Sequence, residues 1–497
     1  MKLHIEGDIN EYYVQTLCMI FYPGEKFTEE PTEGEPELTL ALTERDGGFF
    51  AAARLSQNGK ETTAEKFLPA REDMTRDRLK KLAVGFAVLG AAGEMLRYHP
   101  SWGMLTGVRP SKVATELLRK GLSRNKVRRR LTADYLVIPK KATLATDVAI
   151  REQQIIGTPS PRDCSIYISI PFCPSRCSYC SFVSYTSKSL LSLIPDYLTR
   201  LMEEVRGKFA VAKELGLRVR TVYIGGGTPT ILTEDQLRAL LSLIAECTDV
   251  SALEEFTLES GRPDTITAGK MAAAKEYGVT RVCVNPQSLC DEVLRGVGRM
   301  HTADDFFRAY SIARESGIEC INTDLIVGLP GDCFKTFSDT FDKILSLEPE
   351  NITVHTFCVK RAAGILREGK RPYNLRGGDA GKCVDYSQLR ATATGYIPYY
   401  MYRQKNMVGN FENVGFCKEG TEGYYNIYMM EEVHSIFAAG AGAVTKLVEY
   451  HPDETGKKTV IRRLFNHKYP YEYLGDNAAV EGIREIREFY RERGIGN

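Results

Sequence analysis

The chain of 497 residues has no apolar stretch long enough to cross a membrane. Its longest apolar run, Leu82–Gly93, is far shorter than the roughly 20 residues that a membrane-spanning helix needs. The first residues, Met1–Asp8, carry acidic side chains where a secretory signal peptide needs an apolar segment. These absences argue against a membrane-spanning or exported protein and predict a soluble, cytoplasmic one.

The chain also lacks an excess of charge of either sign. Lys and Arg number 65 and Asp and Glu 64, for a formal net charge of +1, so the composition offers no electrostatic reason to bind nucleic acid or an anionic membrane. The 13 cysteines are odd in number and widely scattered, so they do not suggest a disulfide framework. They indicate a reducing compartment.

The N-terminal part of the chain, residues 1–100, predicts a small α+β domain. Leu38–Thr43 and Phe49–Leu55 alternate like strands, and Asp46-Gly47-Gly48 between them favours a hairpin. A helix is expected over Arg76–Tyr98, ending before a proline. A chain of this length predicts one or two further domains.

Residues 101–160 contain the only tryptophan, Trp102, and predict a helical linker region with three helical segments between Ser111 and Ile156. Seven basic side chains lie in one part of it: Arg119, Lys120, Arg124, Lys126, Arg128, Arg129 and Arg130. They could belong to a helix-turn-helix that reads DNA, or to the solvated faces of two short helices. Because the chain as a whole is neutral, we favour solvated faces.

From Cys164 onward, strand and helix patterns alternate. Six strands are expected at Ser165–Ile170, Thr221–Ile224, Glu255–Glu259, Arg281–Val284, Cys320–Val327 and Asn351–Thr356. Helices are expected between them at Leu190–Leu215, Glu234–Glu246, Thr267–Tyr277, Ala303–Ser316 and Phe334–Leu347. This order predicts a parallel sheet that curls into a full or partial barrel, with the active site at the C-terminal ends of its strands. We assign residues 161–360 to the barrel and residues 361–497 to a C-terminal α/β domain.

Three cysteines follow the first of these strands at the spacing C-x3-C-x2-C, namely Cys173, Cys177 and Cys180. A four-iron cluster normally takes one cysteine per iron, so three ligands leave one iron open to bind a small molecule. The close spacing favours a loop around a cluster. The alternative, a structural zinc site, needs a fourth ligand, and the nearest cysteine, Cys164, lies across an expected strand.

A glycine run, Gly225-Gly226-Gly227-Thr228-Pro229, follows the second strand. Without side chains, the backbone there can approach a ligand closely. The run does not fit a P-loop, because no Gly-Lys-Ser or Gly-Lys-Thr follows. The alternative to a ligand site is a tight turn between strand and helix.

Polar residues accompany the later strands. Glu259 ends the third strand, Gln287 follows the fourth, Arg299 lies in the segment after it, and Asp324 lies within the fifth. A carboxylate such as Asp324 inside an apolar strand is costly unless it faces a polar group, and Arg299 could pair with a carboxylate through two hydrogen bonds. Each residue alone could be a helix cap or a turn residue. Together, at successive strand ends, they predict a ligand site.

The cysteine triad and the Gly-Gly-Gly-Thr-Pro run resemble the radical S-adenosylmethionine (SAM) enzymes. The string from Tyr167 to Cys173, Tyr-Ile-Ser-Ile-Pro-Phe-Cys, is similar to the coproporphyrinogen oxidase branch of that superfamily, the HemN, HemW and HemZ proteins. Trp102–Pro110 and the helices after it resemble the N-terminal extension of the HemZ type. The resemblance implies an α/β fold: a radical SAM partial TIM-type (β/α)6 barrel with an N-terminal α+β extension and a C-terminal α/β domain.

The resemblance also implies the cofactors. A 4Fe–4S cluster would be held by the three cysteines, with SAM at the open iron and room for a second SAM. The first SAM would contact Tyr167, Gly226 and Glu259. The second would lie among Tyr179, Gly227, Thr228, Gln287, Arg299 and Asp324.

The implied reaction is the oxygen-independent oxidative decarboxylation of coproporphyrinogen III to protoporphyrinogen IX, a step of porphyrin and haem biosynthesis. In the family, the reduced cluster splits SAM into methionine and a 5′-deoxyadenosyl radical. The radical takes hydrogen from a propionate side chain, and loss of carbon dioxide and an electron leaves a vinyl group. A flavodoxin or ferredoxin is the expected electron donor. No side chain is assigned a catalytic role of its own.

Three departures from the family leave other functions open. HemN-type oxidases carry a fourth cysteine where this chain has Phe182, and HemW-type haem chaperones carry a histidine where it has Tyr425 before Asn426. Ser169 replaces the usual histidine before Ile-Pro-Phe-Cys. The alternatives are a haem-binding or haem-delivery protein of the HemW kind, against which the missing histidine argues, and another radical SAM reaction on a tetrapyrrole.

Basic side chains in residues 361–497 predict where a substrate would bind. Arg361, Arg403 and Lys405 lie at or after the end of the sixth strand, the last two among tyrosines. Such a surface would suit a flat substrate with several carboxylates, so we expect this part of the chain to cover the substrate. The alternative is solvated loop charge.

Overall fold

A computed structural model describes residues 1–28, 34–107, 109–180, 182–358, 378–404, 407–451, 459–475 and 478–496. The chain forms two compact units. The first consists of Met1–Ile150, Pro372–Gly381 and Met401–Glu412, and the second of Arg151–Arg371, Lys382–Tyr400 and Asn413–Asn497. Four consecutive segments are expected from the sequence, whereas each unit here combines three separate stretches of the chain. The first boundary between the units falls within helix α5 (Pro139–Ile156).

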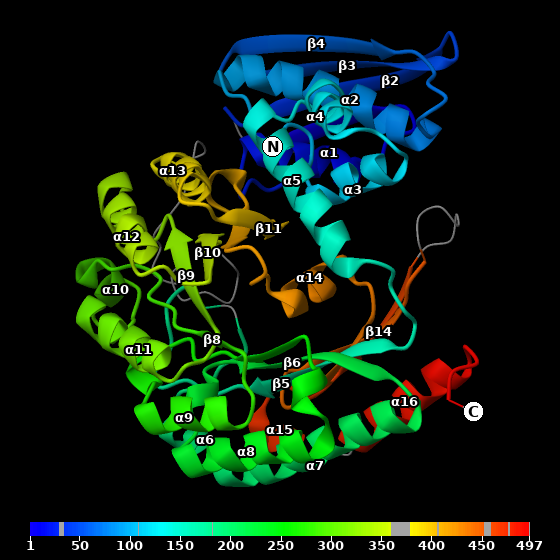
Figure 1. Ribbon diagram of the computed structural model, residues 1–497. Coiled ribbons are helices and arrows are strands. Elements are labelled where there is room, and N and C mark those ends of the chain that lie inside the picture. The colour runs from blue at the N-terminus through cyan, green and yellow to red at the C-terminus, as the bar shows by residue number, and fades with distance from the viewer. Residues whose placement is uncertain are drawn as a thin grey trace. The chain divides into compact units, whose positions relative to one another are not determined.

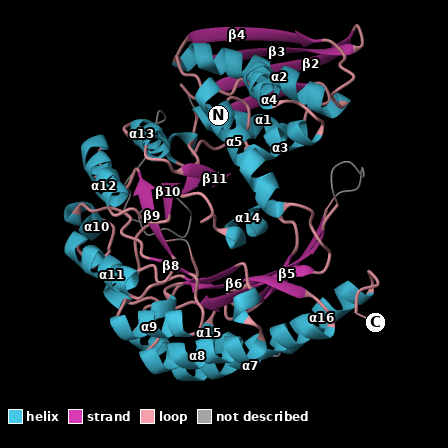
Figure 2. Cartoon of the chain, in the orientation of Figure 1, coloured by secondary structure: helices cyan, strands magenta, loops and turns pink. Residues whose placement is uncertain are grey.

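The first unit contains a four-stranded sheet in the order β1-β2-β3-β4, with helices packed on it (Figure 2). Its first elements are β1 (Lys2–Glu6), α1 (Glu11–Phe21), β2 (Glu37–Arg45), β3 (Gly48–Gln57), β4 (Lys60–Leu68) and α2 (Arg76–Leu96). The predicted hairpin is confirmed, since β2 and β3 pair in antiparallel register from Glu37 opposite Ser56 to Arg45 opposite Gly48. Asp46, with φ 51°, begins the turn between them, as a two-residue hairpin loop requires.

The three helices predicted after Trp102 are present as α3 (Ser111–Arg119), α4 (Arg124–Tyr135) and α5. Their basic side chains form ion pairs inside this unit. Arg124 and Arg128 reach Asp147 at 2.7 and 2.9 Å, and Arg130 reaches Asp134 at 2.8 Å. Three of the seven basic side chains are thus held in ion pairs on these helices.

A buried ion pair ties the segment Met401–Glu412 to this unit. Glu412 accepts hydrogen bonds from Trp102 Nε1 at 2.7 Å and from Lys141 Nζ at 2.5 Å. The side chains of Lys141 and Glu412 are both 0% exposed. Residues 101–150 lie in the same compact unit as the first hundred residues.

The second unit is built on an 11-stranded sheet in the order β11-β12-β10-β9-β8-β7-β6-β5-β13-β14-β15. Six of its strands are parallel and follow one another in chain order: β5 (Asp163–Ile170), β6 (Arg218–Gly226), β7 (Glu255–Leu258), β8 (Arg281–Cys283), β9 (Cys320–Val327) and β10 (Asn351–Thr356). Between them lie α6 (Lys188–Leu191), α7 (Ile194–Glu214), α8 (Glu234–Cys247), α9 (Ala268–Glu276), α10 (Asp291–Gly296), α11 (Ala303–Glu315) and α12 (Phe334–Ser346). Figure 1 shows a curved sheet with these helices on its outer side and α14 (Tyr424–Glu431) on its inner side. The six predicted strands are confirmed, and with the helices between them they form a (β/α)6 partial barrel.

The C-terminal part of the chain extends both edges of this sheet. β13 (Ser435–Ala439) pairs in parallel with β5, and β14 (Val444–Glu449) and β15 (Val460–Phe465) follow in antiparallel order. At the other edge, β12 (Asn413–Cys417) pairs with β10 and is followed by β11 (Ile397–Tyr402). The described residues of 413–497 are therefore part of the barrel unit, because their strands take their hydrogen bonds from its edges. The remaining helices are α13 (Ala380–Ala393), α15 (Pro470–Leu474) and α16 (Ala478–Arg491).

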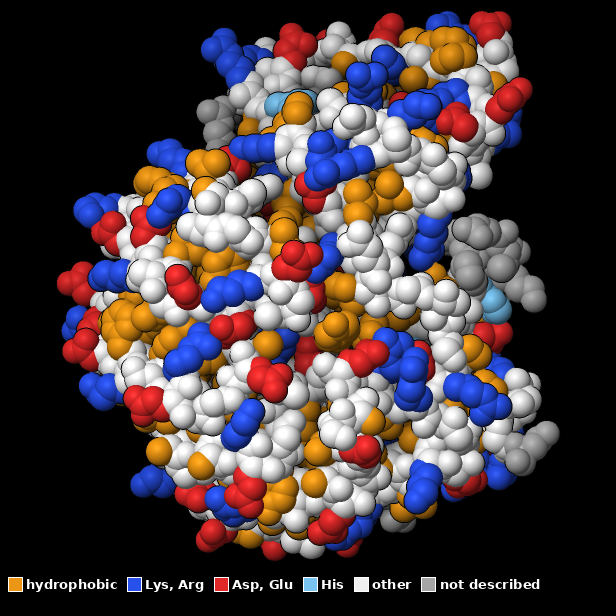
Figure 3. All heavy atoms as spheres, viewed as in Figure 1, with side chains coloured by type: hydrophobic (Ala, Val, Ile, Leu, Met, Phe, Trp, Pro, Cys, Tyr) orange, Lys and Arg blue, Asp and Glu red, His pale blue; other side chains and the backbone are white. Residues whose placement is uncertain are grey.

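The surface and the cysteines agree with the composition. Figure 3 shows acidic and basic side chains interspersed over the face that it presents. All 13 cysteines lie among the described residues and are free. In the described part of the chain, no helix has both the length and the apolar character needed to cross a membrane.

Candidate active site

The three cysteines of the triad lie in a loop at the C-terminal end of β5. The loop closes on a neighbouring segment, because Cys173 N–H donates to Tyr185 O at 3.0 Å and Tyr185 N–H donates to Pro171 O at 2.9 Å. Cys173 and Cys177 are 9% and 8% exposed, and Cys180 is half-buried. The prediction that a loop carries these thiols is confirmed.

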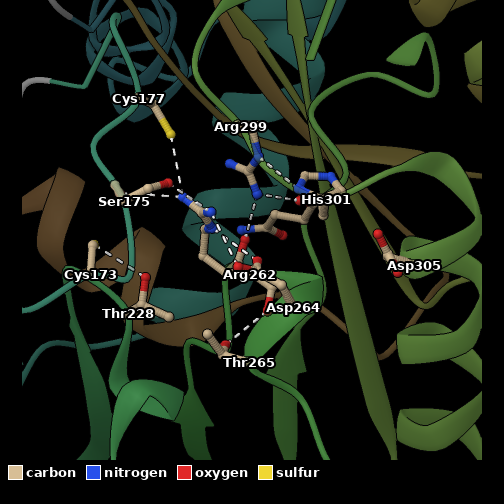
Figure 4. Close-up of polar contacts among 12 residues, drawn as sticks. Cys173, Ser175, Cys177, Thr228, Arg262, Asp264, Thr265, Arg299, His301 and Asp305 are labelled. Carbon is tan, nitrogen blue, oxygen red and sulfur yellow. Dashed lines mark hydrogen bonds and ion pairs between the residues drawn. The ribbon is translucent and has the colours of Figure 1, made fainter. Parts of the chain in front are cut away.

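The glycine run after β6 passes directly beside this loop. Gly227 N–H donates to Ile170 O and Thr228 N–H donates to Phe172 O, both at 2.8 Å. A Cβ on Gly227 would lie 2.5 Å from Phe172 O and 3.0 Å from Cys173 Sγ, so this approach requires glycine. Thr228 Oγ1 lies 3.2 Å from Cys173 Sγ (Figure 4). The run is thus both a turn and one wall of the cysteine loop.

The chemistry of these donors fits an iron–sulfur cluster with one open iron. Burial raises the pKa of Cys173 to about 11, although the hydrogen bond with Thr228 opposes it, and burial also raises the pKa of Cys180. The thiols therefore release protons when they bind a metal. Cys164 lies buried at the beginning of β5 and the triad follows the end of that strand, so Cys164 is not placed as a fourth ligand for zinc.

Glu259 lies where β7 ends, with its carboxyl group against the glycine run. A Cβ on Gly225 would meet Glu259 Oε2 and the Tyr223 ring at 2.7 Å each. Burial raises the pKa of Glu259 to about 8, and the charge of Asp324 adds to this effect. Hydrogen bonds from Tyr223 and from the backbone of Gly226 oppose it. The carboxyl group is therefore mostly protonated at neutral pH when no ligand is bound.

Asp324 projects from β9 into a set of polar side chains. It accepts hydrogen bonds from Asn285 Nδ2 at 3.0 Å and Asn322 Nδ2 at 2.8 Å, and His355 Nε2 lies 3.5 Å away. Burial would raise the pKa of Asp324, but the hydrogen bond and charge of His355, together with further hydrogen bonds, leave that pKa lowered. Glu259 and Asp324 thus have pKa values moved in opposite directions, a pattern typical of sites that separate an acid from a base.

Gln287 follows β8, and it has a strained backbone and a side-chain oxygen with no hydrogen-bond partner among the described residues. Its φ is 65°, a conformation that costs a residue other than glycine about 1–3 kcal/mol. Hydrogen bonds to β9 hold it there, since Gln287 N–H donates to Asp324 O and Ile326 N–H donates to Gln287 O, both at 3.0 Å. The side chain is 9% exposed, and Oε1 has no hydrogen-bond donor among the described residues. Strain and an unpaired acceptor together fit a ligand that brings a donor group.

Arg299 is already engaged inside the protein, unlike the free bidentate donor that the sequence suggested. Its guanidinium group donates to Tyr179 Oη at 3.0 Å, to the carbonyl groups of Gly261 and Asn285 at 2.9 and 2.8 Å, and to His301 Nδ1 at 3.3 Å (Figure 4). Four of its five N–H donors are therefore used. Burial, together with the charge of Arg299, lowers the pKa of His301 to about 4, so this imidazole is neutral. Arg299 orients Tyr179 beside the cysteine loop.

Sequence reasoning missed a stack of three tyrosines in the barrel. Tyr167 of β5 and Tyr223 of β6 are neighbours in register, with ring centroids 6.1 Å apart. Tyr425 of α14 stacks on Tyr223 at 4.5 Å and on Tyr167 at 6.2 Å. Burial raises the pKa of all three. The two strand tyrosines could have been paired from their positions, but nothing in the sequence brings Tyr425 to them.

Sequence reasoning also missed Arg262, which lies at the centre of Figure 4. Its Nη1 donates to Ser175 O at 3.4 Å and to Cys177 Sγ at 3.8 Å, and its Nη2 donates to Ser175 Oγ at 3.0 Å. Its Nε donates to Asp264 at 3.1 Å. The available signal was an arginine just after a strand end, two residues before an aspartate. That signal does not show that the side chain reaches a loop 85 residues earlier.

Of the three predicted substrate contacts, two lie outside the described residues, namely Arg361 and Lys405. The third, Arg403, is 3% exposed and belongs to the first unit. It donates to Leu105 O at 2.5 Å and lies over the ring of Trp102, 5.8 Å from its centroid. Burial lowers the pKa of Arg403 to about 10. Arg403 therefore packs the interior of this unit and does not present the exposed cation that the sequence suggested.

Comparison with known proteins identifies the family. The model of the Radical SAM superfamily matches residues 167–344. The oxygen-independent coproporphyrinogen-III oxidase-like protein HemZ of Bacillus subtilis is 34% identical over 486 residues, which cover 95% of this chain and 93% of that protein. The heme chaperone HemW of the same organism is 33% identical over 326 residues, which cover 65% of this chain and 81% of that protein.

Among solved structures, the coproporphyrinogen III oxidase (HemN) from Escherichia coli is 22% identical, with a TM-score of 0.46, over 60% of this chain and 67% of that one. Membership of the superfamily implies a 4Fe–4S cluster and SAM, which the three free thiols and the orphaned Gln287 acceptor fit. The similarity to HemZ covers nearly the whole of both chains. The chain therefore belongs to the radical SAM superfamily, in the family of the oxygen-independent coproporphyrinogen-III oxidase-like protein HemZ.

Proposed function

We propose that the chain is a radical SAM enzyme that converts coproporphyrinogen III to protoporphyrinogen IX by oxidative decarboxylation without oxygen. The observation that carries this proposal is the similarity to HemZ over 95% of the chain. The meeting of the cysteine loop and the glycine run at the strand ends supports it. When bound, the cluster supplies the electron that cleaves SAM and so begins the radical chemistry.

Different residues of the chain would bind the cluster and the SAM molecules. Cys173, Cys177 and Cys180 would bind the cluster, and Tyr167, Gly226 and Glu259 the first SAM. A second SAM would lie among Tyr179, Gly227, Thr228, Gln287, Arg299 and Asp324. Glu259, with its pKa of about 8, would ionise more readily beside the positive charge that SAM carries, because a nearby positive charge favours the carboxylate.

The substrate and the partner follow from the same proposal. Arg361 and Lys405 would pair with substrate carboxylates. A flavodoxin or ferredoxin would supply electrons. The 13 free cysteines suit a reducing compartment such as the cytoplasm.

Haem binding or delivery is the second candidate, because HemW is 33% identical over 65% of the chain. The residue in place of the chaperone histidine is Tyr425. It is buried, and its ring stacks on Tyr223 at 4.5 Å, so its side chain is engaged within the barrel. This arrangement favours the enzyme over the chaperone.

An anaerobic assay of the reconstituted protein with SAM, dithionite, coproporphyrinogen III and a one-electron acceptor tests the proposal, because each decarboxylation also releases one electron. We expect protoporphyrinogen IX, carbon dioxide and deoxyadenosine, identified by mass spectrometry. Deoxyadenosine without decarboxylation would reject the substrate and point to another radical reaction, and tight stoichiometric haem binding without either product would favour delivery. Cys173→Ser should lose all products, whereas Cys333→Ser, at an exposed cysteine, should keep them.

A further inference from the structure

A buried cation lies against the cysteine loop without being part of it. Arg262 follows β7 and is 4% exposed, and in Figure 4 its guanidinium group points toward Ser175 and Cys177. Nη1 donates to Cys177 Sγ at 3.8 Å and Nη2 donates to Ser175 Oγ at 3.0 Å. One side chain therefore touches both a ligand sulfur and the loop that carries it.

Asp264 fixes the direction of this guanidinium group. Its two carboxylate oxygens accept from Nε at 3.1 Å and from Nη2 at 3.3 Å, which turns the remaining N–H groups of Arg262 toward the loop. An arginine stays protonated in proteins, and its charge acts more strongly on a neighbour where water is excluded. The other buried cation nearby, Arg299, donates to Tyr179, His301 and two carbonyl groups instead.

We propose that Arg262 is a positioning residue that raises the reduction potential of the cluster through its hydrogen bond to Cys177 Sγ. Cluster potentials depend on net charge and on hydrogen bonds to the sulfur atoms. A cationic N–H stabilises the added negative charge of the reduced state more than it stabilises the oxidised state. The cluster would take up one electron from the reductant and pass that electron to SAM. No proton moves to or from Arg262 in this exchange.

The competing explanation is that Arg262 only clamps the loop through Ser175. Three variants separate the explanations. Ser175→Ala removes the Oγ acceptor, which is the shorter of the two Ser175 contacts at 3.0 Å against 3.4 Å for the carbonyl oxygen, and it leaves the sulfur contact. It should therefore change the potential only if this side-chain clamp matters. Arg262→Gln removes the charge, whereas Arg262→Lys keeps it.

The test is a redox titration of the reconstituted full chain without air, with dithionite and mediators, in which electron paramagnetic resonance measures the reduced cluster. For Arg262→Gln we expect the ratio of reduced to oxidised cluster at a fixed potential to fall about tenfold, the usual effect of one hydrogen bond to a charged group. For a one-electron couple this is a shift of about 59 mV to lower potential. Ser175→Ala should stay within about twofold of the native ratio, and Arg262→Lys should recover most of the loss.

An unchanged potential in a fully loaded Arg262→Gln protein would overturn the proposal, as would an equal shift in Ser175→Ala. If Arg262→Gln takes up no cluster, Arg262→Lys decides: a native-like ratio supports the proposal, and a tenfold loss or an empty site rejects it. The proposal rests on the cluster of the proposed function and not on its substrate. Since the titration contains no tetrapyrrole, failure of the decarboxylation assay leaves its result intact.

Discussion

Glu259 allows the most demanding prediction, because a buried carboxyl group changes stability with pH in a calculable way. Its pKa is raised from 4.5 to about 8 by burial and by the charge of Asp324. Between these values the folded state binds more protons than the unfolded state, so the free energy of unfolding falls as pH rises. The contribution of Glu259 is fully present below pH 4.5 and is lost as the pH passes through about 8.

The size of the effect follows from the difference between the two pKa values. Each pKa unit corresponds to about 1.36 kcal/mol, so a rise from 4.5 to about 8 gives an upper limit of about 5 kcal/mol. Glu259→Gln has no such proton to lose. Because pH 5 already lies above the unfolded pKa of 4.5, the variant should gain up to about 4 kcal/mol of this limit in free energy of unfolding, relative to the native chain, between pH 5 and pH 9.

Urea unfolding of the metal-free and SAM-free proteins, followed by circular dichroism at pH 5, 7 and 9, measures this difference. Asp324→Asn is the matched control, because it removes the negative charge that, together with burial, raises the pKa of Glu259. In this variant the pH at which the free energy of unfolding falls should therefore be lower. A difference between native and Glu259→Gln that stays constant from pH 5 to pH 9 would refute the reasoning. It would mean that Glu259 is already ionised in the folded chain.

Two further predictions concern a close approach and a buried ion pair. Gly227→Ala should abolish cluster uptake in iron analysis, because the new Cβ would lie 2.5 Å from Phe172 O. Gly296→Ala, with open space around its Cβ, should load normally, and normal loading of both variants would contradict the role of Gly227. Glu412→Gln should lower the free energy of unfolding by about 3–5 kcal/mol, because it removes the charge opposite the buried Lys141. A loss below about 1 kcal/mol in urea unfolding would show that the pair contributes little to stability.

The strands that carry the site could be predicted closely, because each is a short apolar run between turn signals. Cys320–Val327 and Asn351–Thr356 match β9 and β10 residue for residue. The polar residues at the strand ends could then be placed on one edge of the sheet. A second hairpin turn, Asn58-Gly59 with φ 51° and 73°, carries the same signal as Asp46-Gly47 and was predictable too.

Contacts between distant segments could not be predicted. β13 pairs with β5, beginning with Ser435 opposite Cys164. The sequence of a short strand does not indicate which other strand it will pair with. Arg403 follows a tyrosine-rich strand, which suggested an exposed cation, but the sequence does not show that Trp102 lies beneath it. The contact between Arg262 and the cysteine loop could not be predicted for the same reason, since Cys177 lies 85 residues earlier in the chain.

Release of deoxyadenosine by the anaerobically reconstituted chain is the decisive measurement. With about four irons bound per chain, the protein should form deoxyadenosine from SAM when dithionite is added. Cys177→Ala should bind less iron and form none. Zinc or no metal at these thiols, or an iron-loaded and reduced protein that leaves SAM intact, would contradict a cluster with one iron open to SAM.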